Sequence, residues 1–277
     1  MLAGSVLLTA QRQTLDVTGM VVEVKPAERL LVVSHDPVPG VMPAMIMPFL
    51  VRNDAQLRGL TPGAIVTFTL RANADAAYAD DLRVLRYESG EQDPLTVRRL
   101  RLLRSAHAAA QLELNQAVPD FTLTDQAHKR IALSQLRGKV VVMNFIYTSC
   151  ALPQFCYRMT NHFSVLQNRF GGRDGRDLVL LSITFDPARD TPERLAEYAT
   201  QWKADATRWH FLTGPSDEIR KVADAFGLDY FPDEGVISHS LRTVIVDRMG
   251  RLRANVEGNT FTAQQLGDLV NAALRNQ

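Results

Sequence analysis

The sequence predicts two domains: a small all-β barrel of five strands, then a larger domain in which strands and helices alternate. Three observations support this prediction. The chain has 277 residues, which is more than one average domain needs. Of these residues 46% are hydrophobic and 22% are charged, a composition that is typical of proteins with packed cores. Its first third contains short β runs broken by turn signals. Its second half contains long apolar runs separated by helical segments.

Five β runs make up the predicted barrel, which we place at residues 17–88. Pro26 and two turns rich in proline and glycine, at residues 36–40 and 61–63, separate the runs. Five short strands in about seventy residues suit a small closed barrel of the OB-like type. The runs cover residues 17–24, 30–34, 44–51, 65–70 and 77–84.

The composition changes at residues 89–116, where a polar segment precedes a basic run with helical character. We interpret this segment as a linker with a solvated helix. From residue 117 to 277, two nearly continuous apolar runs indicate central strands buried on both faces. Thr191 and Pro192 suit the start of a helix. The order of elements predicts a thioredoxin-like α/β domain. It has apolar strands at 140–147 and 178–185, helices at 157–170, 190–198, 216–226 and 262–276, and a hairpin of 241–247 with 252–256.

The N-terminal segment and the charge balance of the chain limit the locations and partners that we expect for the protein. Residues 1–16 begin with an apolar run that ends in small residues, which indicates either the remnant of a secretion signal or anchor, or an ordinary terminus. No other stretch approaches about 18 uninterrupted apolar residues, so we expect membrane contact only through such an anchor. Lys and Arg number 31 against 30 Asp and Glu, a balance that argues against nucleic acid as a partner.

Residues 34–49 hold three of the eight methionines. On a strand, Met45 and Met47 lie on one face, because side chains two residues apart point the same way. His35 ends the preceding run and reaches that face if the two strands pair. Two thioethers and one imidazole form a soft ligand set that favours Cu(I) or Ag(I). The alternative is that the methionines fill a small core.

Residues 17–87 also resemble the CusF-like family of periplasmic copper-binding proteins, through a His-Asp-Pro turn and a Met-Pro-x-Met-x-Met motif. The resemblance implies a five-stranded barrel in which His35, Met45 and Met47 bind Cu(I). Some members of that family place a tryptophan over the metal where this chain has Met42. We expect Met42 to act as an additional ligand or as a cap.

The two cysteines of the chain, Cys150 and Cys156, lie between a predicted buried strand and the start of a helix. Backbone N–H groups and the helix dipole favour thiolate there, and thiolate is both the nucleophile and the metal ligand. This position predicts that the two cysteines are functional rather than a disulfide with a purely structural role. Pro153 predicts a bend in the loop between them. A disulfide needs the two Cα atoms within about 7 Å, which a bent loop permits without requiring.

Residues 117–276 resemble the Sco/SenC family of thioredoxin-like proteins, which deliver copper to the CuA centre of cytochrome c oxidase. The resemblance implies that Cys150, Cys156 and His239 bind copper, as Cu(I) or Cu(II). The loop between the cysteines has two residues more than is usual in that family, and Ala151 and Tyr157 replace the usual prolines. The matching motifs are Pro-Asp-Phe-Thr-Leu at 119–123, Phe-Ile-Tyr-Thr-x-Cys at 145–150, Asp-Pro-Ala-Arg-Asp-Thr-Pro at 186–192 and Ser-His-Ser at 238–240.

Two soft-ligand sets on one chain predict a periplasmic copper chaperone, tethered to the inner membrane if the anchor exists. It takes copper from a donor protein and passes it to an acceptor, which the Sco/SenC resemblance implies is the oxidase subunit that carries CuA. One alternative is a thiol-disulfide reductase or peroxidase that uses a thiol reductant, with Cys150 attacking and Cys156 resolving. Another is copper buffering or resistance, which would use the same ligands with a different partner.

Overall fold

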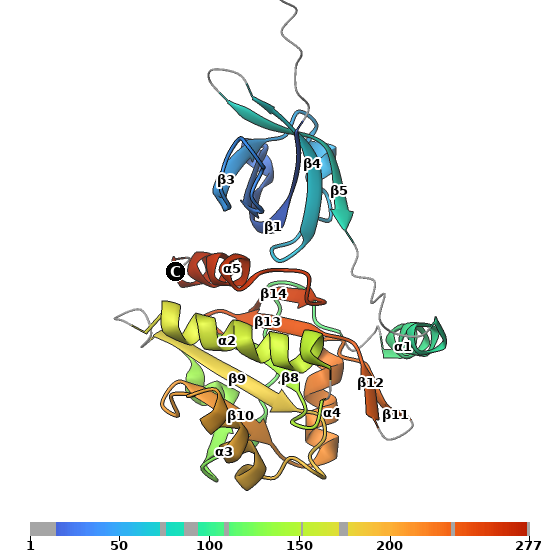
Figure 1. The fold of residues 1–277 in the computed structure, drawn as a ribbon, viewed down its shortest axis with the longest axis vertical. Helices are drawn as coiled ribbons and strands as arrows, with labels where there is room; N and C mark the ends of the chain where they lie inside the picture. The colour runs from blue at the N-terminus through green and yellow to red at the C-terminus, as the bar shows by residue number, and fades with distance from the viewer. Residues whose placement is uncertain are drawn as a thin grey trace, which may run out of the picture.

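The computed structural model describes residues 15–72, 76–85, 94–107, 111–150, 152–171, 177–233 and 236–275. The predicted leader remnant, except its last two residues, and parts of the predicted linker lie outside these ranges. Figure 1 shows the barrel at one end of the molecule and the α/β domain at the other. No helix within the described ranges combines the length and the apolar character that crossing a bilayer would need.

The N-terminal strands close into a barrel in the order β1-β2-β3-β5-β4, which confirms the predicted five-stranded fold. Along β4, residues alternate between a buried inner face with Val66, Phe68 and Leu70 and a partly exposed outer face. The rings of Phe49 and Phe68 meet edge to face inside, with centroids 4.8 Å apart. The strands are β1 (Leu15–Lys25), β2 (Leu30–His35), β3 (Met45–Leu50), β4 (Ile65–Ala72) and β5 (Ala77–Leu85).

The second domain is built on a sheet of seven strands in the order β14-β13-β8-β9-β10-β6-β7. The three central strands, β8, β9 and β10, are parallel, and every residue of β8 and β9 is buried. This burial on both faces confirms the interpretation of the long apolar runs. The strands are β6 (Thr122–Asp125), β7 (Arg130–Ala132), β8 (Val140–Ile146), β9 (Leu178–Thr184), β10 (Trp209–Thr213), β13 (Arg242–Val246) and β14 (Leu252–Glu257).

Four helices flank this sheet and complete the thioredoxin-like domain. The Thr191 side chain accepts a hydrogen bond of 3.3 Å from the backbone N–H of Arg194, so the predicted N-cap is confirmed. Figure 1 shows α2 in front of the sheet and α5 between the sheet and the barrel. The helices are α2 (Arg158–Arg169), α3 (Pro192–Gln201), α4 (Ser216–Ala225) and α5 (Ala263–Arg275), and shorter 3-10 turns cover Pro26–Glu28, Asp54–Leu57 and Leu133–Leu136.

The helix of the linker, α1 (Pro94–His107), packs against a separate hairpin of β11 (Tyr230–Asp233) and β12 (Val236–His239). The Thr96 hydroxyl donates to Asp233 over 3.4 Å, and the Arg99 guanidinium lies 5.9 Å from the centre of the Phe231 ring. Leu100 is buried. The expectation of a solvated helix was therefore wrong for this face, because Leu100 is buried and Thr96 contacts Asp233 of the second domain.

Candidate metal centres

The first candidate centre lies where β8 ends and α2 begins. Residues 147–157 connect the two elements, and Pro153–Tyr157 form a single π-helical turn that carries Cys156 into the start of α2. A π turn holds more residues than an α turn, and Phe155 leaves helical geometry within it, at φ −101° and ψ −106°. Cys150 is half-buried, Cys156 is buried, and both are free thiols.

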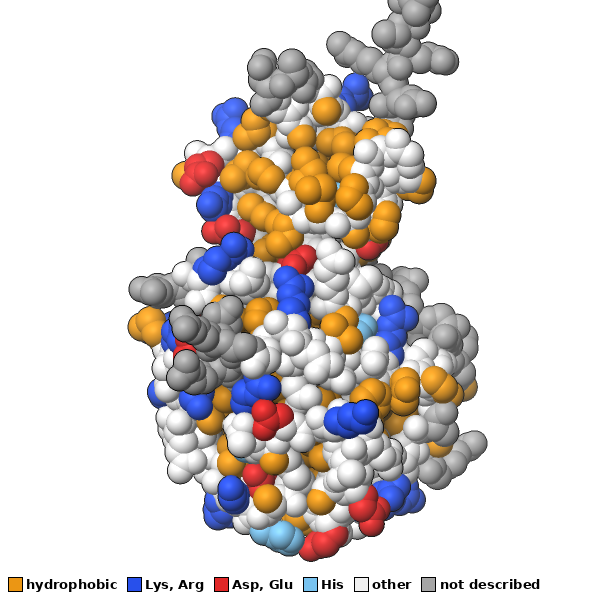
Figure 2. Space-filling model, turned by 60° about the vertical axis from the view of Figure 1, so that its left-hand side comes forward, with side chains coloured by type: hydrophobic (Ala, Val, Ile, Leu, Met, Phe, Trp, Pro, Cys, Tyr) orange, Lys and Arg blue, Asp and Glu red, His pale blue; other side chains and the backbone are white. Residues whose placement is uncertain are grey.

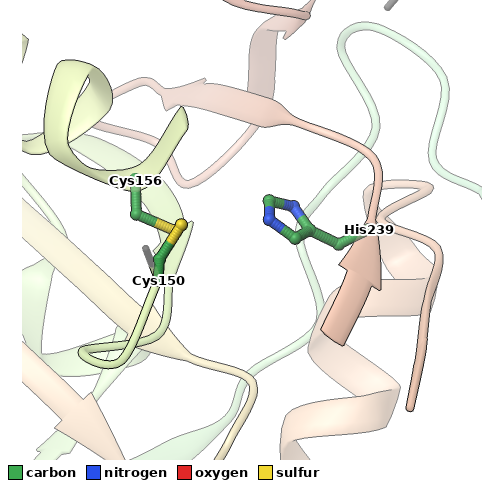
Figure 3. Close-up of side chains that lie close together, drawn as sticks. All are labelled: Cys150, Cys156 and His239. Carbon is green, nitrogen blue, oxygen red and sulfur yellow. The ribbon is translucent and has the colours of Figure 1, made fainter. Parts of the chain in front are cut away.

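His239 reaches the two thiols from the hairpin on the opposite side, as Figure 3 shows. Its ring is held edge-on by Tyr147 and Phe155, with centroids 5.8 Å and 6.0 Å away, and packs on Phe185 at 4.8 Å. Its Nδ1 lies 2.8 Å from the Ser240 carbonyl oxygen. Since a carbonyl only accepts, Nδ1 carries the proton, and Nε2 is the nitrogen with the lone pair that a metal needs.

The predicted ligand atoms of Cys150, Cys156 and His239 all lie within 4.8 Å of one another. Within the described part of the chain, these three side chains form the group of Cys, His, Asp or Glu residues whose ligand atoms are close enough together to bind one metal ion. Two sulfurs and one imidazole nitrogen in a largely buried site suit copper, since thiolates select Cu(I) and imidazole binds both oxidation states. The residues fit the metal that the sequence predicts, and the tertiary fold brings together side chains about ninety positions apart.

The two cysteines have opposite acidities. The pKa of Cys150 is lowered to about 4, chiefly by a hydrogen bond from the Cys156 thiol and further by the neighbouring His239 side chain, against the opposing effect of burial. Burial raises the pKa of Cys156 well above its usual value, and the neighbouring Cys150 and Asp190 add to this effect. The metal-free pair therefore holds one negative charge, on Cys150, with the proton on Cys156.

Alkylation of the reduced, metal-free protein by iodoacetamide is expected to modify Cys150 at a rate that barely changes between pH 6 and pH 8. A thiol with a pKa near 4 is already thiolate over this range, whereas an ordinary thiol with a pKa of about 8.5 gains roughly tenfold in rate per pH unit. Mass spectrometry should find one label on the wild-type chain and almost none on Cys150→Ser. A tenfold rise per unit would contradict the low pKa.

A buried carboxylate that the sequence analysis left aside supports the cysteine loop. Asp190 is 0% exposed and accepts hydrogen bonds from the hydroxyls of Thr148 and Thr184 and from the Thr148 backbone N–H, the last over 3.0 Å. Thr148 lies two residues before Cys150, so Asp190 ties the first thiol to the end of β9. The available signal was its place in the motif at 186–192, which the sequence analysis used only as part of the Sco/SenC resemblance.

The second candidate centre lies in the barrel, where β2 and β3 pair. His35 faces Met45 and Val33 faces Met47 across the two strands, so the imidazole and both thioethers lie on the same face of the paired strands. His35 is 1% exposed, and its Nδ1 lies 2.7 Å from the Asp36 carbonyl oxygen, so Nδ1 carries the proton.

The other ring nitrogen of His35, Nε2, is buried without a hydrogen-bond partner. A buried nitrogen lone pair costs free energy unless it is satisfied, and a soft cation beside two thioethers would satisfy it. Met45 is 41% exposed, Met47 is partly buried, and Met42 packs on the barrel core from the turn that precedes β3. The residues of this group also fit Cu(I).

The remaining histidines lie away from both groups. His210 pairs with buried Asp125 at 3.1 Å, and exposed His128 with Glu193 at 3.0 Å. His162 on α2 is buried against Phe261, and burial lowers its pKa to about 4. The side chain of His107 lies outside the described residues. The three described histidines are therefore structural or exposed.

Comparison with known proteins links both domains to copper-handling families. The family model described as SCO1/SenC matches residues 109–274, and the model described as copper binding periplasmic protein CusF matches residues 14–81. The SCO1 protein homolog of Bacillus subtilis (strain 168) is 34% identical over 111 residues. That match spans 40% of this chain and 56% of the relative.

Solved structures resemble the second domain. A SCO1/SenC family lipoprotein from Bacillus anthracis aligns with a TM-score of 0.52 and 27% identity, over 58% of this chain and 96% of that protein. BsSco, described with a disulfide switch and as a member of the Sco family of cytochrome c oxidase assembly proteins, aligns with a TM-score of 0.51 and 26% identity. That alignment covers 60% of this chain and 99% of BsSco.

Proposed function

The chain belongs to the SCO1/SenC family, and on that premise we propose that it is a copper chaperone of the periplasm. In this proposal the barrel holds Cu(I) between His35, Met45 and Met47, and the second domain holds copper between Cys150, Cys156 and His239. The acceptor is the CuA centre of cytochrome c oxidase. The observation that carries the proposal is the convergence of two thiols and an imidazole within 4.8 Å. The CusF match and the description of BsSco support the location and the acceptor.

The geometry favours exchange of the metal through Cys150. Cys156 and His239 are buried, whereas Cys150 is partly exposed and carries the negative charge of the pair. An incoming ligand from a partner protein therefore reaches copper from the side of Cys150. The buried thiol and the imidazole, whose ring is clamped by aromatic neighbours, keep the metal in place until that ligand arrives.

An anaerobic Cu(I) titration against a chelator tests the two sites. The wild-type chain is expected to bind two equivalents, Cys150→Ser with Cys156→Ser should remove one, and Met45→Leu with Met47→Leu should remove the other. Met249→Leu is the matched control, because Met249 is 67% exposed and far from both groups in sequence. Retention of both equivalents by both double variants would contradict the assignment.

The acceptor is tested in cells that lack the protein. Loss of CuA absorbance in the oxidase, restored by the wild-type chain but not by the double cysteine variant, is expected for delivery. Unchanged CuA with lowered tolerance of added copper would instead assign the protein to copper resistance.

The unequal acidities of the cysteines favour a second candidate, thiol-disulfide exchange. The Cys150 thiolate would attack a substrate disulfide and release one substrate thiolate, and Cys156 would then displace the other. The products are a Cys150–Cys156 disulfide and a reduced substrate dithiol, and a thiol reductant must restore the pair. Rapid steady-state turnover of a disulfide substrate by the metal-free protein would favour this activity, and turnover no faster than free thiol would exclude it.

A further inference from the structure

The barrel rests directly on the second domain, and the contact involves α5 and β14 (Figure 1). Met20 of β1 is fully buried and joins the core of the second domain. Gly63, at φ +91°, approaches so closely that a Cβ there would lie 2.6 Å from the Val256 side chain. The two domains therefore share a close-packed interface, and residues of one can shape a site in the other.

Polar contacts across this interface converge on the end of β2. The Gln265 side-chain amide of α5 donates to the Ser34 carbonyl oxygen over 3.2 Å and to the Asp36 carboxylate over 3.1 Å. The Ser34 hydroxyl donates to Asp268 over 2.8 Å. Arg169 of α2 holds the other oxygen of Asp268, so this carboxylate is fixed from within its own domain.

The direction of the Gln265 amide follows from its other contacts. Its side-chain oxygen accepts a hydrogen bond of 2.8 Å from the Thr262 backbone N–H, and its own backbone N–H donates to the Thr262 hydroxyl. The side-chain NH₂ group must then point to the barrel, where both of its partners are acceptors. Gln265 is 4% exposed, so these bonds are made in a site that water barely reaches.

The two residues that α5 holds, Ser34 and Asp36, are the two neighbours of His35 in sequence. The backbone carbonyl of Asp36 accepts the Nδ1 proton of His35, which leaves Nε2 buried and unpartnered beside the methionines. A partner that fixes the orientation of a ligand histidine raises metal affinity, and its removal typically costs 10–100-fold. Here the segment that carries this partner is held by another domain.

We propose that Gln265 is a positioning residue for the barrel's metal group: α5 of the SCO1/SenC domain fixes the strand end that carries His35, so that the barrel binds Cu(I) at full affinity only when docked on α5. The inference rests on the proposed function of His35, Met45 and Met47. It makes the second domain a determinant of how tightly the first holds its metal.

The test measures Cu(I) affinity in the full chain carrying Cys150→Ser and Cys156→Ser, which leaves the barrel group as the proposed site. Gln265→Ala in this background is expected to weaken Cu(I) binding about tenfold or more. Gln264→Ala is the matched control, because the same side chain is removed one position away, where it is exposed. A merely structural role for Gln265 would lower the unfolding midpoint and leave the affinity at the control value, which would overturn the proposal.

Asp36→Ala gives a second route that leaves α5 intact. It removes the carboxylate that Gln265 binds but keeps the backbone carbonyl that holds His35, so it decides the question if Gln265→Ala fails to fold. It should weaken Cu(I) binding, and Asp36→Ala with Gln265→Ala should lose less than the sum of the two free energies. Full additivity, or an unchanged affinity in Asp36→Ala, would overturn the positioning role. A background chain that binds no Cu(I) would instead disprove the metal group itself, and the inference with it.

Discussion

Replacement of His239 by alanine is expected to weaken Cu(II) binding at the cysteine site by more than about 100-fold, since loss of a direct ligand should exceed the roughly 10–100-fold cost of losing an outer partner. The imidazole supplies the nitrogen ligand of the group, and Cu(II) prefers nitrogen and oxygen ligands, whereas two thiolates alone still suit Cu(I). The variant should therefore keep its Cu(I) equivalent while Cu(II) binding is lost. Titration with each oxidation state, with electron paramagnetic resonance of the Cu(II) form, measures both.

His128→Ala is the matched control for this variant, because it removes the same side chain from an exposed position 3.0 Å from Glu193. It should leave both affinities at the wild-type values. Equal Cu(II) affinity in His239→Ala and His128→Ala would remove His239 from the ligand set and leave the two cysteines without a third ligand.

Replacement of Asp190 by alanine is expected to destabilise the protein by about 3 kcal/mol or more, because each donor that loses its acceptor away from water costs about 1–3 kcal/mol. The carboxylate is 0% exposed and accepts three hydrogen bonds, and its loss takes the acceptor from two hydroxyl hydrogens and one backbone N–H. Urea unfolding of the metal-free protein measures the change.

The same variant should also weaken copper binding at the cysteine site, because Thr148 no longer holds the loop that carries Cys150. Asp217→Ala is the control, since Asp217 is exposed on α4 and lies 3.9 Å from Lys221. A loss of stability no larger than that of Asp217→Ala would show that the Asp190 contacts do not support the loop.

Much of the fold and most of the cysteine site could be predicted from the sequence. The apolar runs of β8 and β9 indicated central strands buried on both faces, and the caps and turns placed the helices of the second domain to within three residues. Cys150 and Cys156 could be assigned a functional role from their place between a strand and a helix. His239 could be joined to them only through a family resemblance, because nothing local to a Ser-His-Ser segment indicates a ligand.

The supporting residues could not be predicted, and the reason is physical. Asp190 and Gln265 act through hydrogen bonds to residues 42 and 229 positions away, and no periodicity in the chain encodes such pairs. The hairpin of β11 and β12 was also missed, because its strands are short and pair only with each other.

Local sequence patterns were therefore sufficient for the barrel strands, the long buried strands, the helices and the kinds of ligand, since burial and hydrogen bonding impose a period on each element and copper selects soft donors. Tertiary structure decided three further features. It brought His239 to the thiols, it divided the charge of the pair so that Cys150 alone is ionised, and it placed α5 against the strand end that carries His35. Each depends on distances between segments remote in the chain, and only the packed fold sets those distances.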